Sequence, residues 1–336
     1  MMVPVSAHPG QSVSSLSFSP TARHSLLAAS WDCSVRVYDT TPCPTPAAGA
    51  AGAAAEPQGF RCNAQHVLPA PVLDVCHDAQ GHVAYTGGLD KSVHAISLTD
   101  GGGRRVLGPQ AHVEAVSAVA FNAAHQCLFS GSWDGSVCVF DPRQATALQA
   151  RLELQSAQVY SLATAANTLV AATGGKRLLL FDARYMSAPM ETRPSPLKTQ
   201  LRSVAMRPDG ECFAVGSTEG RVAVEYVEAG NAEAQSRKYA FKCHRQGDVA
   251  FPVNAVAFNP NPASHSVFAT GGSDGCVSVW LGERRKRQQS LPVLPVPVAA
   301  LAYNSDGSQL AIASSHTFEG SQPGDALLNN LYIRSM

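Results

Sequence analysis

The sequence lacks an excess of charge of either sign, and it lacks the segments that direct a chain into or through a membrane. Its 25 lysines and arginines balance 25 aspartates and glutamates, so the formal net charge is zero. The overall field that draws a protein to nucleic acid or another polyanion is therefore missing. No stretch approaches the roughly 20 apolar residues that cross a bilayer, and the N-terminus has no secretory leader. We expect an intracellular protein whose partners include no direct nucleic acid and no membrane.

Paired cysteines and common catalytic motifs are also missing. The nine cysteines are spread singly, without a C-x-x-C pair, and several lie in or beside predicted strands. We expect reduced thiols that pack as small apolar side chains. No G-x-S-x-G, P-loop or H-E-x-x-H motif occurs, and the eleven histidines are dispersed. We therefore predict no catalytic residues, no metal and no cofactor. An enzyme with a histidine-lined site in the middle of the fold remains an alternative hypothesis.

The chain does contain a repeated segment. Residues 131–141 read GSWDGSVCVFD, and close copies are SWDCSVRVYD at 30–39 and GSDGCVSVW at 272–280. Looser copies begin at Gly88, Gly174 and Thr218. A tight turn followed by alternating residues predicts a β-hairpin in each copy, and an apolar run before each hairpin, such as 116–122, supplies another strand.

The spacing of the copies indicates a propeller. Intervals of 58, 44, 85 and 55 positions separate five acidic turn residues, Asp32, Asp90, Asp134, Glu219 and Asp274, with the copy at Gly174 inside the longest interval. A period of roughly 40–45 residues is typical of WD-repeat blades, and longer intervals indicate insertions. Residues 298–303, 309–313 and 330–334 can form a seventh unit, closed by an outer strand from residues 3–5. We predict an all-β fold, a single seven-bladed β-propeller of WD repeats over residues 1–336.

Two segments interrupt the repeats. Residues 42–59 are rich in alanine, glycine and proline and show no period of 2 or 3.6, which predicts a disordered insertion in the first blade. Residues 284–287 read RRKR. This basic run is either a solvated hairpin or a nuclear-import signal, and we favour the hairpin because exposed β-turns commonly carry such charges.

The chain resembles the third member of the budding-uninhibited-by-benomyl family, which is a propeller of the spindle checkpoint. The resemblance runs from about residue 12 to the C-terminus, and its most specific parts are LKTQLR at 197–202, EGRVAVEY at 219–226, KYAFKCHR at 238–245 and FPVNAV at 251–256. It implies a non-catalytic adaptor of the nucleus that acts at the kinetochore in mitosis. It also implies two partners for a monomeric propeller: a checkpoint kinase or its relative, through an acidic helical GLEBS motif, and a phosphothreonine motif of a kinetochore scaffold.

The resemblance assigns the GLEBS site to three residues. Trp31 and Trp133 match tryptophans that pack against the motif, and Arg202 matches an arginine that pairs with its glutamates. Tryptophan and arginine are the residues that most often dominate interface energy. The alternative is that both indoles only fill gaps between blades. The copy at Ser273 and Asp274 has no tryptophan, so the fold does not demand one, and we favour the binding role.

The resemblance assigns the phosphothreonine site to Arg221 and Lys242. A phosphate dianion needs two convergent cations, which an arginine fork beside a lysine supplies. The two residues are neighbours if 220–226 and 239–243 run antiparallel. Without the resemblance, ordinary surface pairs with Glu225 or Glu228 would be the preferred reading. Two adjacent residues are weaker candidates, His244 and Arg245.

A second function stays open. The sister propeller, an mRNA-export factor of the nuclear pore, resembles this chain through the same tryptophans and binds a GLEBS motif on a nucleoporin. Glu225 stands where the export propeller typically has histidine, and zero net charge gives weak support for RNA binding. The checkpoint adaptor is therefore the favoured hypothesis.

Overall fold

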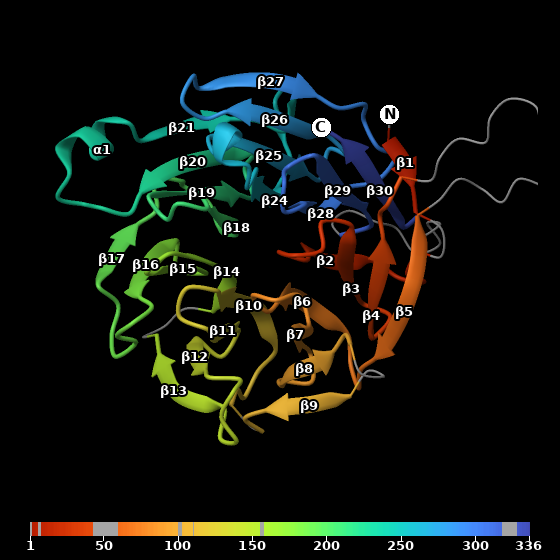
Figure 1. Ribbon diagram of the computed structural model, residues 1–336. Helices are drawn as coiled ribbons and strands as arrows, with labels where there is room; N and C mark the ends of the chain where they lie inside the picture. The colour runs from red at the N-terminus through yellow and green to blue at the C-terminus, as the bar shows by residue number, and fades with distance from the viewer. Residues whose placement is uncertain are drawn as a thin grey trace, which may run out of the picture.

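Seven antiparallel sheets of four strands stand around a common axis (Figure 1). The structure, a computed structural model, describes residues 2–5, 8–42, 60–99, 103–109, 111–154, 158–317 and 328–336. The innermost strand of each sheet packs against that of the next, and the seventh packs against the first, so the ring is closed. This arrangement confirms the predicted all-β, seven-bladed propeller.

The strands are given from the axis outward. Blade 1 has β2 (Val13–Phe18), β3 (Ser25–Ser30), β4 (Ser34–Asp39) and β5 (Arg61–Val67). Blade 2 has β6 (Val72–His77), β7 (Val83–Gly88), β8 (Val93–Ser97) and β9 (Arg104–Leu107). Blade 3 has β10 (Val116–Asn122), β11 (Cys127–Ser132), β12 (Ser136–Phe140) and β13 (Leu148–Glu153). Blade 4 has β14 (Val159–Ala165), β15 (Thr168–Thr173), β16 (Arg177–Asp182) and β17 (Glu191–Pro194).

Blade 5 has β18 (Leu201–Met206), β19 (Cys212–Ser217), β20 (Arg221–Tyr226) and β21 (Tyr239–Lys242), with the short helix α1 (Ala232–Ser236) before its last strand. The hairpin of β22 (Arg245–Gln246) and β23 (Val249–Ala250) leads to blade 6. Blade 6 has β24 (Val253–Phe258), β25 (Val267–Gly272), β26 (Val277–Leu281) and β27 (Lys286–Ser290), with the 3-10 helix η1 (Pro262–Ser264) after β24. Blade 7 has β28 (Val298–Tyr303), β29 (Gln309–Ser314), β30 (Asn330–Ser335) and β1 (Met2–Pro4).

Blade 7 joins the two ends of the chain. Its outer strand β1 pairs antiparallel with β30, with Met2 opposite Arg334 and Pro4 opposite Tyr332. Figure 1 shows β1 and β30 side by side. The prediction that residues 3–5 supply the closing strand is therefore confirmed. Pairing the first strand with the last leaves no gap in the ring through which the sheets can separate.

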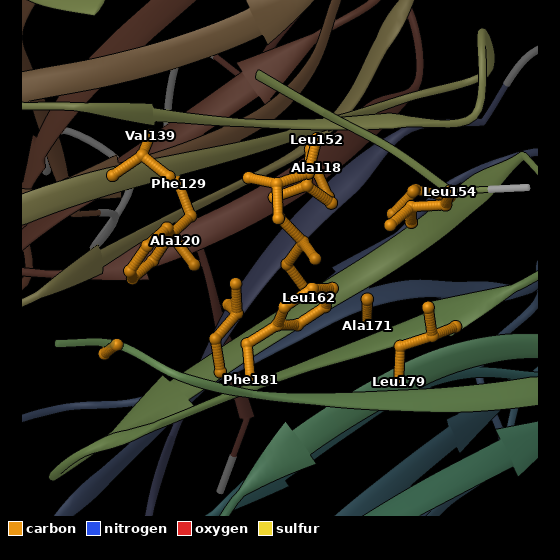
Figure 2. Packing of buried hydrophobic residues seen from close by; sticks show 14 residues of the cluster. Ala118, Ala120, Phe129, Val139, Leu152, Leu154, Leu162, Ala171, Leu179 and Phe181 are labelled. Carbon is orange, nitrogen blue, oxygen red and sulfur yellow. The ribbon is translucent and has the colours of Figure 1, made fainter. Parts of the chain in front are cut away.

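Each blade buries both of its faces, which explains the continuous apolar runs in the middle strands. In β16, Leu178 and Leu180 pack toward blade 5, whereas Leu179 and Phe181 pack toward blade 3. Figure 2 shows this second contact, where Phe181 and Leu179 meet side chains of blade 3 such as Phe129. Because successive side chains alternate between the two faces, one strand contributes to two cores.

The inner strands share a β-bulge at their second residue. In each, the pairing with the next strand shifts register around one residue, and the seven bulged residues are Ser14, Leu73, Ser117, Tyr160, Arg202, Asn254 and Ala299. All seven line a cavity of about 460 Å³ on the axis. A bulge frees a residue from the ladder and re-aims its side chain, here toward the axis.

Side chains beside the bulges tie each blade to the next. Ser14 Oγ donates to the Val72 carbonyl at 2.6 Å, and Ser15 Oγ donates to Asp74 Oδ1 at 2.6 Å. Asp74 Oδ2 in turn accepts from the Val119 backbone N–H at 2.8 Å, so one carboxylate joins blades 1, 2 and 3. Burial raises the pKa of Asp74 to about 6 despite these donors. Equivalent bonds cross the other boundaries.

The cysteines in the described residues are free thiols, which confirms the prediction of unpaired cysteines for that part of the chain. Burial raises the pKa of Cys138, Cys212 and Cys243 to about 12. These three therefore stay protonated and pack as small apolar groups.

The two interrupting segments lie in connections between strands. The insertion predicted at 42–59 falls between β4 and β5, and residues 43–59 lie outside the described residues. The basic run 284–287 begins in the turn between β26 and β27 and continues into β27, and the Arg285 guanidinium lies 4.9 Å from the Tyr239 ring centroid. This position agrees with the hairpin interpretation. Among the helices of the described chain, none has the length and apolar character of a membrane span.

Candidate functional site

The predicted GLEBS residues lie on one face of the ring. In each antiparallel blade the start of the inner strand adjoins the end of the second strand, as Val13 does Ser30. The residue that follows the second strand donates its backbone N–H to the carbonyl of the residue that precedes the inner strand. In blades 1 and 3 the donors are Trp31 and Trp133, and both hydrogen bonds are 3.0 Å long. Arg202 is the second residue of β18 and lies at the same end of blade 5. We call this side of the propeller the Trp31 face.

Trp31 and Arg202 line the central cavity, whereas Trp133 is not part of its wall. All three side chains are half-buried. The positions that correspond to the two tryptophans in the other blades hold small or aliphatic residues, Leu89, Gly174, Thr218, Ser273 and Ser315. The fold therefore does not require an indole at this turn. Together the three residues offer apolar faces and one cation, spread over blades 1, 3 and 5.

Acidic turn residues stabilise the two turns that carry Trp31 and Trp133. Asp32 accepts hydrogen bonds from Ser34 Oγ at 2.5 Å and from Arg36 at 2.7 Å. Asp134 accepts from the backbone N–H of Val113 at 2.9 Å and from Ser136 Oγ at 2.6 Å. Burial alone would raise the pKa of Asp134, but these donors lower it to about 2. The carboxylate is thus charged at neutral pH, and the turn that presents the indole is held rigid.

Arg221 and Lys242 face one another across neighbouring strands. β20 and β21 run antiparallel with these two residues directly opposite, so both side chains project from the same side of the sheet. That side of the sheet faces blade 4, because Ala223, which lies on the same side as Arg221, packs against blade 4. Both residues lie at the Trp31 face, at the start of β20 and the end of β21. The predicted antiparallel arrangement is confirmed.

The surroundings of this cationic pair differ from the surface-pair alternative. Arg221 Nε lies 3.3 Å from Glu219 Oε1, without the geometry of a hydrogen bond. Glu225 instead pairs with Arg193 and Lys238, away from both cations. The Lys242 side chain is exposed, and no acidic group of the described residues pairs with it. Lys242 therefore presents an exposed ammonium beside the Arg221 guanidinium, whose Nε is buried 3.3 Å from Glu219.

The structure corrects the weaker candidate His244. Its ring is buried, with Nδ1 2.9 Å from Asp274 Oδ1 and Nε2 2.8 Å from Thr270 Oγ1. Trp280 Nε1 donates to the same Thr270 hydroxyl at 2.9 Å. This network ties the segment after Lys242 to blade 6 and engages both ring nitrogens of His244. Arg245 is half-buried and donates to the Glu219 carbonyl at 2.9 Å.

Sequence reasoning missed Tyr160. It occupies the bulge of blade 4 that corresponds to Arg202 in blade 5 and lines the same cavity. Its hydroxyl donates to Gln158 Oε1 at 2.7 Å. Aligning the second residue of each apolar run would have found it. Within the described residues, no three histidine, cysteine, aspartate or glutamate side chains are grouped to hold a metal ion.

The repeats and the ring define the protein as a WD-repeat propeller, and the family described as WD domain, G-beta repeat, matches residues 3–39, 104–141 and 235–280. The chain is 38% identical to mitotic checkpoint protein BUB3.1 of Arabidopsis thaliana, over 93% of this chain and 86% of that protein. It is 36% identical to mitotic checkpoint protein bub-3 of Caenorhabditis elegans, over 95% and 88%. The chain therefore belongs to the BUB3 family of mitotic checkpoint proteins, as the resemblance predicted.

A relative with a different name is similar over the same length. The chain is 32% identical to the poly(A)+ RNA export protein of Schizosaccharomyces pombe, over 94% of this chain and 84% of that protein. Checkpoint proteins and an RNA export protein are thus both similar to this chain over nearly its whole length. Identity over the aligned residues is higher for the two checkpoint relatives above, at 38% and 36%, whereas the spindle assembly checkpoint protein bub3 of the same organism is 30% identical.

Proposed function

We propose that this protein is a non-catalytic adaptor of the spindle assembly checkpoint whose Trp31 face binds two peptides. Trp31, Trp133 and Arg202 bind the GLEBS motif of a checkpoint kinase or its relative. Arg221 and Lys242 bind a phosphothreonine motif of a kinetochore scaffold. The adaptor acts in the nucleus, and at the kinetochore in mitosis. The observation that carries the proposal is the position of all five residues on one face of the ring.

The GLEBS site suits an acidic helix. Half-buried indoles offer flat apolar surfaces for the apolar side of the helix, and Arg202 offers charge-assisted hydrogen bonds to its glutamates. The turns around Trp31 and Trp133 are held by Asp32 and Asp134, so little conformational entropy is lost when a peptide docks.

The phosphothreonine site suits a dianion. Arg221 and Lys242 project from one side of a sheet, and the guanidinium can take two phosphate oxygens while the ammonium takes the third. Glu219 contacts Arg221 only at 3.3 Å and without a hydrogen bond, so a phosphate can displace it. An unphosphorylated threonine offers no charge for either cation.

Calorimetry with the two peptides tests the proposal. Trp133→Ala should weaken the GLEBS peptide by roughly 30-fold or more, the cost of a typical hot-spot residue of at least 2 kcal/mol, and leave the phosphopeptide unchanged. The double change Arg221→Ala and Lys242→Ala should do the reverse. Lys176→Ala, an exposed cation on the next blade, is the control. Equal binding of phosphorylated and unphosphorylated peptides would remove the phosphate-reading role.

The second candidate is a nuclear-pore mRNA-export propeller that binds a nucleoporin GLEBS motif. The similarity to the poly(A)+ RNA export protein is the observation that favours it. Both candidates use the same tryptophans, so mutations of Trp31 or Trp133 do not separate them. Purification of the protein from mitotically arrested cells does, because a co-purifying kinase supports the adaptor and a co-purifying nucleoporin supports the export factor.

A further inference from the structure

A groove of about 640 Å³ lies between blades 3 and 4, apart from the residues assigned above. Its floor is apolar, formed by Leu152 and Leu154 of blade 3 and Leu179 of blade 4. Leu154 and Leu179 lie at the same end of the core between these blades (Figure 2). One end of the groove reaches the Trp31 face, because Leu154 follows the end of β13 and donates its backbone N–H to the Gly135 carbonyl in the turn beside Trp133.

One wall of the groove carries an arginine without an acidic partner. Arg177 is the first residue of β16, and Arg221 is the first residue of β20. Each lies two residues after the turn position that is acidic in most blades. In blade 5 that position holds Glu219, which lies 3.3 Å from Arg221, but in blade 4 it holds Gly175. No acidic side chain of the described residues pairs with Arg177, which is exposed and lines the groove. The groove thus offers one uncompensated positive charge above an apolar floor.

The opposite wall adds no second available cation. Arg151 Nε lies 2.8 Å from Glu153 Oε1, and its other nitrogens contact Asp134 at 3.4 Å and the Ala111 carbonyl at 2.8 Å. Its charge is therefore already balanced. A phosphate dianion requires two convergent cations, whereas a single carboxylate is matched by one arginine fork. The charge in the groove favours a glutamate or aspartate side chain over a phosphate.

The groove adjoins the turn that presents Trp133. Asp134 anchors that turn and also contacts Arg151 in the groove wall, so a peptide seated on Trp133 has a direct route into the groove. We propose that the groove between blades 3 and 4 binds an acidic, apolar segment flanking the GLEBS motif. One carboxylate pairs with Arg177 and one aliphatic side chain packs on Leu154 and Leu179. This inference rests on the proposed GLEBS site.

Two synthetic peptides of the motif-bearing kinase test it, one trimmed to the GLEBS motif and one extended by its native flanks. The extended peptide should bind about tenfold more tightly, the value of one charge-assisted contact. Arg177→Ala should remove this advantage and leave the trimmed peptide unaffected. Ala188→Glu, at an exposed position of the groove wall, should do the same by repelling the acidic flank. Lys176→Ala, next to the groove but outside its wall, is the matched control.

Hydrogen exchange supplies the second readout. The extended peptide should slow exchange in β13 and β16, and the trimmed peptide should not. Equal affinities for the two peptides, or an advantage that survives both Arg177→Ala and Ala188→Glu, would overturn the inference while leaving the GLEBS site intact. Failure of both peptides to bind would instead overturn the GLEBS site, and the groove assignment with it.

Discussion

Glu225 should stabilise the contact between blades 4 and 5. Its side chain and that of Arg193 are each only 9% exposed, and Glu225 Oε2 lies 3.3 Å from Arg193 and 2.8 Å from Lys238 Nζ. Arg193 also donates to the Tyr226 carbonyl at 2.8 Å. Removing one partner of a buried ion pair costs about 3–5 kcal/mol. Arg193 keeps Glu191 and its carbonyl contacts, so we expect Glu225→Ala to cost about 2–3 kcal/mol.

Urea unfolding followed by circular dichroism measures this loss. The midpoint should fall for Glu225→Ala while the slope with denaturant stays unchanged, because the folded state buries the same surface. Glu233→Ala, an exposed glutamate in the first turn of α1, is the control and should stay within about 0.5 kcal/mol. If the two variants unfold at the same urea concentration, the Arg193–Glu225 pair does not stabilise this boundary.

Three further predictions concern the ring. The pKa of Asp74 is about 6 in the folded protein, above the value near 4 in an unfolded chain. Its contribution to the free energy of unfolding is therefore complete below about pH 4 and is lost as the pH rises through about 6. Asp74→Asn should reduce the difference between the free energies of unfolding measured at about pH 4 and pH 7 by on the order of 2–3 kcal/mol. Gly131→Ala should cost about 1–3 kcal/mol because its Cβ would collide with the next blade, whereas Gly103→Ala, with open space around it, should be neutral; equal melting temperatures would contradict this. Asp274→Ala should cost about 1–3 kcal/mol by leaving buried His244 without its acceptor, and hydrogen exchange in blade 6 should rise; unchanged exchange would refute the role of the network.

The repeat made the fold predictable from sequence. The hairpin turns of blades 1, 2, 3 and 6 carry an Asp-Gly or Asp-X signal, and the interval between turns distinguishes a propeller from a sandwich. The closing strand was predictable too, because blade 7 lacked an outer strand and the N-terminus had a spare one. The role of Asp74 in joining three blades was not predictable, because its hydrogen-bond donors Ser15 and Val119 belong to the two neighbouring blades. Such contacts depend on how blades pack, which a single repeat does not encode.

The placement of the site was predictable where strand pairing determines it. Arg221 and Lys242 are opposite one another because β20 and β21 pair in a fixed register, and alternation then puts both on one side. His244 shows the limit of reasoning from adjacency. It lies two residues after Lys242, but its φ of 46° turns the backbone and sends its ring into blade 6. The resemblance named Lys242 and adjacency added His244, and only the structure distinguished the exposed side chain from the buried one.

We propose that both peptide sites on the Trp31 face are occupied at the same time. Sequential calorimetric titration tests it most directly: the protein is first saturated with the GLEBS peptide, and the phosphothreonine peptide is then added. We predict one-to-one binding of the second peptide with an affinity within about twofold of that for the free protein, because independent sites have no coupling free energy. Loss of the second binding event, or displacement of the first peptide, would contradict the account.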